Sequence, residues 1–145
     1  MTSPKLHVVD NFKLVQVQLP YPPFDLNPNK NNGVHWGKYN GIKEKYKRDC
    51  WITTLERVGT ACIMPAGDIP LKLVFYYKAT RPDTDNLLAA AKYGIDGMAS
   101  ALKINDNVFD PLIVTRLPVE TSAFAAGGPC LVAEFPCQVS VKRRA

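Results

Sequence analysis

The sequence predicts an α+β domain in which two helices pack on one face of a small mixed β-sheet. Two kinds of segment lead to this prediction: short runs rich in β-forming residues, which are typical of strands, and longer runs with apolar residues at helical spacing. The last two strand-like runs follow each other without a helix between them, so the order is β-α-β-α-β-β. In chain order the predicted elements are a strand at 12–19, a helix at 42–62, a strand at 71–78, a helix at 86–102, and strands at 108–119 and 131–141.

The length of 145 residues fits one domain, residues 1–145, with flexible ends at 1–11 and 142–145. The hydrophobic fraction of 46% and the charged fraction of 21% are ordinary for a globular protein. The net charge of +5 and the isoelectric point near 9.1 permit a polyanionic partner but do not require one.

The four cysteines form no CxxC pair, and two histidines are too few to complete a convincing zinc site. The first residues form no apolar signal segment, and no run approaches the ~20 apolar residues of a membrane span. We therefore expect a cytoplasmic protein with reduced thiols and no membrane partner.

The first strand alternates, with Val15, Val17 and Leu19 on one face, and prolines end it. Residues 24–41 predict a long loop, because they are rich in asparagine and glycine and lack apolar periodicity. This segment mixes cations with aromatic side chains, a composition suited to phosphates and unstacked bases, although a solvated loop without ligand is the alternative. The residues concerned are Lys30, His35, Trp36, Lys38 and Tyr39.

The first helix carries a basic surface. Its apolar stripe is formed by Ile42, Tyr46, Cys50, Leu55, Val58 and Cys62. Lys43, Lys45, Lys47 and Arg48 fall largely off that stripe, on the first two turns. Cations at a helix N-terminus oppose the helix dipole, by tenths of a kcal/mol each, and an anionic partner would offset this cost. A solvated basic face explains the pattern equally well.

The strand at 71–78 is apolar enough to be central in the sheet, and it leads directly to Arg81 and the acidic segment behind it. Asp85 or Asn86 is expected to cap the helix that follows. The predicted buried face of that helix consists of Leu87, Leu88, Ala91, Ile95, Met98 and Leu102.

Three aspartates flank the second helix. Asp83 and Asp85 precede it in a short turn, and Asp106 follows it and is expected to return to the same end. Three hard oxygen ligands with little sulfur or imidazole nearby suit Mg²⁺ or Mn²⁺. Such a site would orient water and stabilise the oxygens of an in-line displacement. The competing interpretation is a set of capping and turn residues, which is a common use of aspartate.

Lys92 lies on the same helix face as Asp85 and Asp96, because the spacings of seven and eleven residues fall within roughly 40° of one another at ~100° per residue. Lys92 and Asp96 could be a simple surface ion pair worth ~0.3–0.5 kcal/mol. Alternatively, the fixed ammonium would stabilise charge on a scissile phosphate beside the metal site.

Several segments together resemble the RusA family of Holliday junction resolvases. Leu19-Pro20-Tyr21-Pro22-Pro23 resembles the end of the family's N-terminal strand, and Asp83-Thr84-Asp85-Asn86 matches its D-x-D-N signature. Lys92-Tyr93-Gly94-Ile95-Asp96-Gly97 resembles its K-x-x-x-D segment, and Ile104-Asn105-Asp106 its terminal D-D pair. The resemblance covers roughly residues 12–141 and implies a RusA-like fold.

The resemblance also implies an activity: a homodimeric, Mg²⁺-dependent endonuclease that resolves four-way DNA junctions by paired nicks, in recombination and repair. Asp83, Asp85 and Asp106 would bind the metal, and Lys92 would be the catalytic lysine. Such a protein would act in the cytoplasm of a bacterial host, encoded by a phage or prophage. The candidate DNA-binding residues are Arg81, Lys30, Lys38, Lys43, Lys47 and Asn86.

Two departures from the family pattern leave an alternative open. The family's lysine follows the second aspartate by four residues, where this chain has Ala89, whereas Lys92 follows by seven. Asn105 also replaces the first residue of the D-D pair. The alternative is a protein of the same fold that binds junction or duplex DNA without cutting it.

Overall fold

The computed structural model describes residues 12–27, 36–122 and 128–139. The predictions made for residues 1–11, residues 142–145, Lys30 and His35 lie outside the described residues.

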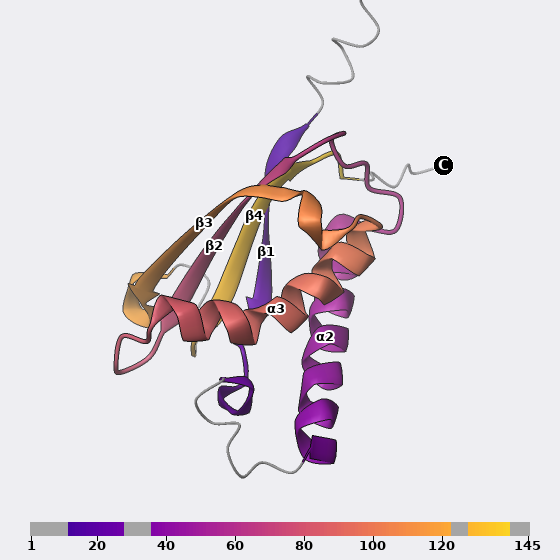
Figure 1. The fold of residues 1–145 in the computed structure, drawn as a ribbon. Helices are drawn as coiled ribbons and strands as arrows, with labels where there is room; N and C mark the ends of the chain where they lie inside the picture. Colours follow the sequence, from indigo (N-terminus) through magenta and orange to yellow (C-terminus); the bar gives the residue numbers. More distant parts are fainter. Residues whose placement is uncertain (1–11, 28–35, 123–127, 140–145) are drawn as a thin grey trace, which may run out of the picture.

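The described chain forms an α+β domain with a four-stranded mixed sheet and two helices (Figure 1). Strand β2 pairs in parallel with β3 and antiparallel with β4, and β1 pairs antiparallel with β4, which gives the strand order β1-β4-β2-β3. The central position predicted for the second strand, β2, is confirmed. The elements are β1 (Lys13–Pro20), η1 (Phe24–Leu26), α2 (Trp36–Val58), β2 (Ile69–Tyr77), α3 (Thr84–Leu102), η3 (Asp106–Val108), β3 (Phe109–Pro118), η4 (Val119–Thr121) and β4 (Cys130–Cys137).

The core lies on one face of the sheet. Ala133 of β4 is in register with Val17 of β1 and with Leu73 of β2, and all three side chains are buried. The same core cluster contains Tyr46 from α2 and Met98 from α3, so both helices cover this face. Figure 1 shows α3 running across the strands with α2 packed against it.

Helix α2 begins earlier than the sequence predicted. It starts at Trp36, so the predicted loop 24–41 was wrong for its last six residues. Two glycines and an asparagine weaken local helix propensity there, by up to ~1 kcal/mol for each glycine. Packing outweighs that cost, because the Tyr39 ring meets the Tyr93 ring of α3 edge-on at 6.5 Å, with the hydroxyl oxygens 3.2 Å apart.

The start of α3 also differs from the prediction. Asp83 is the N-cap residue, with φ −72° and ψ 138°, and its carbonyl accepts a hydrogen bond from the Leu87 N–H at 3.1 Å. Asp85 and Asn86 therefore lie inside the first turn, and the expectation that one of them caps the helix was wrong. An acidic residue at Asp85 still suits the positive end of the helix dipole.

The two helices touch where α3 has no side chains. A Cβ at Gly94 would lie 2.6 Å from the Tyr46 ring and 2.8 Å from Cys50 Sγ, and a Cβ at Gly97 would collide with the carbonyl oxygen of Lys47. These glycines let the helices approach closely, which brings the basic side of α2 against the second half of α3.

Neither helix in the described part of the chain is long and apolar enough to cross a membrane.

Candidate functional site

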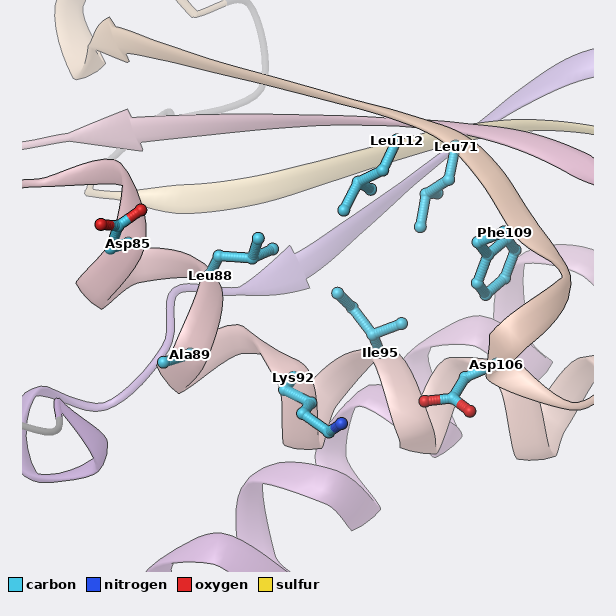
Figure 2. Close-up of a pocket in the computed structure, with 9 residues that line it drawn as sticks. All are labelled: Leu71, Asp85, Leu88, Ala89, Lys92, Ile95, Asp106, Phe109 and Leu112. Atoms are coloured by element: carbon cyan, nitrogen blue, oxygen red, sulfur yellow. The ribbon is translucent and has the colours of Figure 1, made fainter.

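A surface cavity of about 410 Å³ lies between α3 and strands β2 and β3. Asp85, Lys92 and Asp106, three of the residues singled out from the sequence, all line it. Its remaining lining is mostly apolar, so the charged groups stand around a hydrophobic floor (Figure 2). The other lining residues are Leu71, Leu88, Ala89, Ile95, Phe109 and Leu112.

Lys92 stands between the two aspartates along the cavity, with its amino group on the Asp106 side (Figure 2). Both Lys92 and Ala89 line this cavity. A lysine at either position would therefore face the same space.

Asp106 is positioned by the turn that ends α3. Lys103 adopts the left-handed conformation, with φ 61°, and its N–H donates to the carbonyls of the last helical turn. The chain then reverses, and the Asn105 side chain accepts a hydrogen bond from the Asn107 N–H at 3.0 Å, which starts η3 at Asp106. Asn105 thus has a structural role that an amide oxygen fulfils as well as a carboxylate.

Asp106 lies beside Asp96, which the sequence analysis left out of the candidate site. Partial burial, and then the neighbouring Asp106 carboxyl, raise the pKa of Asp96, while the positive charges of Lys92 and Lys47 act to lower it. The charge of Lys92 acts on Asp96 across a longer distance than in the ion pair on α2. In that pair, Lys45 Nζ and Asp49 Oδ2 are 2.7 Å apart. The signal for Asp96 was present in the sequence, since it is the acidic end of the K-x-x-x-D segment.

Asp85 does not meet Asp106 within one chain. Asp85 and Asp96 are eleven residues apart on α3, which corresponds to about 16 Å along the helix axis at ~1.5 Å per residue. Asp106 lies at the Asp96 level, so the expectation that it returns to the end where Asp83 and Asp85 stand was wrong for a single protomer. Within residues 12–27, 36–122 and 128–139, no group of three or more histidine, cysteine or acidic side chains could hold a metal ion.

Asp83 faces a different space. It lines a second cavity of about 430 Å³ together with Arg81 and Asn86. The turn before α3 is fixed by Arg116 of β3, whose guanidinium donates to the Pro82 carbonyl at 2.9 Å. The three aspartates of the D-x-D-N and D-D segments are thus divided between two cavities on the two sides of α3.

The basic side of α2 adjoins the second half of α3. Lys43 Nζ lies 5.4 Å from the centre of the Tyr93 ring, and the charge of Lys47 reaches Asp96. Lys38 is exposed on the first turn of α2. Among the cations of α2 predicted to bind DNA, Lys47 is therefore placed near Asp96, and Lys43 lies over Tyr93 on the same helix.

The thiols do not supply a nucleophile. All four cysteines are free, and Cys50, Cys130 and Cys137 are buried. Burial raises the pKa of Cys50 to about 12 and that of Cys137 to about 11, so both are protonated at neutral pH.

Fold and site together define an α+β domain with acidic and basic side chains arranged along one helix. No known family model matches the chain. It is 33% identical over 106 residues to an uncharacterized protein of Xylella fastidiosa strain Temecula1, and the match covers 70% of this chain and 67% of that protein. The chain belongs to the same family as this bacterial protein.

Proposed function

We propose that this protein is a Mg²⁺-dependent, structure-selective endonuclease with a RusA-like fold, which resolves four-way DNA junctions by paired nicks in recombination and repair. The observation that carries the proposal is the shared cavity: Asp85, Lys92 and Asp106, chosen from sequence motifs, all line it. As a RusA-type resolvase it would act as a homodimer in the cytoplasm of a bacterial host, encoded by a phage or prophage.

The donor set beside the first cavity fits a hard divalent cation. Asp106 borders that cavity and also a smaller neighbouring one, which Asp96 lines as well. Asp96 and Asp106 present carboxylate oxygens side by side, without sulfur or imidazole among the residues described there. Mg²⁺, or Mn²⁺ in its place, would be held by these two carboxylates, where it would polarise a phosphate oxygen and favour attack by water.

The chain's own cations would orient the DNA. Lys92, in the same cavity, would stabilise negative charge on the scissile phosphate or its leaving oxygen. Lys43 and Lys47, which lie over the neighbouring half of α3, would hold the adjacent backbone.

Asp83 and Asp85 would act across the dimer. A single Mg²⁺ binds its ligands at about 2.1 Å, which the axial separation of Asp85 from Asp106 does not allow within one protomer. The three-aspartate set implied by the family resemblance would therefore need carboxylates from both protomers.

The test is cleavage of a synthetic four-way junction in the presence of Mg²⁺ and of EDTA. We expect symmetric nicks that require Mg²⁺ and that fall by at least about 100-fold in Asp106→Asn, because a bound metal supplies several kcal/mol of transition-state stabilisation. Asp49→Asn is the matched control, since Asp49 is a partly exposed aspartate on α2 paired with Lys45. Unchanged nicking by Asp106→Asn would refute the metal role.

A second candidate function is binding of junction or duplex DNA without cleavage. It is favoured by one observation, the division of Asp83, Asp85 and Asp106 between two cavities. This candidate predicts salt-sensitive junction binding and intact DNA under Mg²⁺ and Mn²⁺ alike.

A further inference from the structure

The second cavity lies across the first turn of α3 from the first one, and the two share no lining residue. One wall is the segment that follows β1, with Tyr21, Phe24 and Asn27, and the other is the start of α3. Its volume of about 430 Å³ falls within the range of ~300–1,000 Å³ that is usual for small-molecule sites.

Two aromatic side chains line this cavity in different ways. Tyr21 is partly buried and held edge-on against the Phe75 ring, with ring centres 6.3 Å apart. Phe24 also lines the cavity and exposes 65% of its surface. A large exposed ring at a cavity is a surface on which another flat, apolar group can stack.

The polar lining is matched to a nucleotide rather than to an apolar peptide. Arg81 is an exposed cation of the kind that binds phosphate. Asn27 and Asn86 contribute amides that can both donate and accept hydrogen bonds, as the edges of bases require. Asp83, also exposed, lines the same cavity.

We propose that this cavity receives one unstacked base of the DNA, with Phe24 as its stacking surface and Arg81 on the neighbouring phosphate. Base stacking on aromatic rings tolerates any sequence, while amide contacts add preference. The inference rests on the proposed function, because it takes DNA as the ligand. It adds a site that selects where along the strand the cut is placed.

The test measures DNA binding after removal of one DNA base, after removal of the Phe24 ring, and after both, to see whether the two losses are coupled. Asp106→Asn protein, which is expected not to cut, is titrated with four-way junctions that carry one abasic nucleotide at each position near the exchange point in turn. We expect one position at which loss of the base weakens binding about tenfold, which is within the range that stacking supplies. In Phe24→Ala on the same background, the abasic junction and the intact junction should bind with equal affinity.

Matched variants separate stacking from packing. Phe24→Trp should keep the sensitivity to base loss, whereas Phe24→Leu should lose it despite its apolar bulk. Leu14→Ala, which alters a residue on β1 that is 67% exposed, should leave the sensitivity unchanged. Thermal unfolding of each variant shows whether the fold is retained.

The result that overturns the inference is base sensitivity of equal size in Phe24→Ala, or no position at which base removal matters. Failure of the proposed function is read separately, from nicking by the unaltered chain. A chain that nicks junctions but shows no coupling rejects the base site alone. A chain that does not nick, but shows the coupling between base removal and ring removal, supports the base site and rejects the nuclease.

Discussion

The two halves of α3 hold their acidic side chains in contrasting surroundings. Asp83 and Asp85, at the first turn, are exposed and face two different cavities. Asp96 and Asp106, three turns further on, are half-buried, adjoin each other and lie within reach of the positive charge of Lys47. Adjacent carboxylates are the setting that favours a bound divalent ion, whereas the two carboxylates of the first turn face separate cavities.

The difference follows from how α3 is packed. Its second half crosses α2 at two glycines, which brings Lys47 close, and it is followed by the turn that carries Asp106. Its first turn follows Pro82, whose carbonyl accepts a hydrogen bond from Arg116. One helix therefore presents a charge cluster at one end and a cavity of about 430 Å³ at the other.

The contrast between the two halves of α3 is tested most strongly in dimers that contain one protomer of each of two variants. If Asp85 of one protomer serves the Asp106 end of its partner, Asp85→Asn and Asp106→Asn should each lose junction cleavage by at least about 100-fold. Mixed heterodimers should then recover one site of the two, because one protomer pairing keeps both aspartates.

The measurement is nicking of junctions that are labelled in each strand in turn. Mixing the two variants is expected to restore single nicks. A mixture that stays inactive while each variant alone is inactive would place both aspartates in one protomer's site. Full activity of Asp85→Asn alone would remove Asp85 from the chemistry and leave the Asp96–Asp106 end to act by itself.

The next largest effect is expected on the free energy of unfolding, from a change at the close crossing of α2 and α3. Gly97→Ala should lower the free energy of unfolding by about 1–3 kcal/mol, because the new methyl group meets the Lys47 backbone rather than a side chain that could move. Denaturant unfolding measures this. Gly41→Ala on α2 is the control, since a Cβ there has open space, and it should stabilise by about 0.5–1 kcal/mol. Equal effects of the two changes would mean that the close crossing is absent.

The basic side of α2 is tested by the salt dependence of DNA binding. Lys47→Gln should reduce the slope of log K against log salt concentration by about 0.9, the loss of one phosphate contact. Lys45→Gln is the control, because Lys45 is occupied by Asp49 at 2.7 Å. An unchanged slope for Lys47→Gln would leave the Asp96–Asp106 end without its proposed phosphate contact.

The sequence predicted the fold class and most elements, because burial follows residue patterns that are local. Alternation placed Val15, Val17 and Leu19 on one face, which is the buried one in the structure, and helical spacing placed Met98 in the core. It failed at the start of α2, where the deciding contact, Tyr39 with Tyr93, lies 54 residues apart in the chain.

The sequence indicated candidate site residues but not which of them lie together. Spacing along the helix placed Asp85, Lys92 and Asp96 on one face, and of these Asp85 and Lys92 line the first cavity. The position of Asp106 depends instead on the left-handed residue Lys103 and the Asn105 turn, neither of which periodicity reveals. For the same reason Asp96, which Asp106 meets through that turn, was missed.

The smallest expected effect concerns the pH dependence of stability at the Asp96 end. Burial, and then Asp106, raise the pKa of Asp96 above its ordinary value of 3.8, so the folded chain binds this proton more tightly than the unfolded chain. Stability at this group is therefore lost as pH rises from 3.8 through the raised pKa. Without divalent ions, Asp96→Asn should raise the free energy of unfolding at pH 7, and the difference should vanish below pH 3.8.

With Mg²⁺ the order of stability should reverse, so that the unaltered chain is more stable than Asp96→Asn. An ion between Asp96 and Asp106 stabilises both ionised carboxylates, so it should stabilise the unaltered chain and have little effect on Asp96→Asn. Thermal unfolding at pH 7, with and without Mg²⁺, measures both parts. Asp49→Asn serves as control, since it only removes an exposed ion pair worth ~0.3–0.5 kcal/mol and should respond to Mg²⁺ like the unaltered chain. Identical Mg²⁺ responses in all three proteins would exclude an ion from the Asp96–Asp106 end, and the contrast between the two halves of α3 would then be one of burial alone.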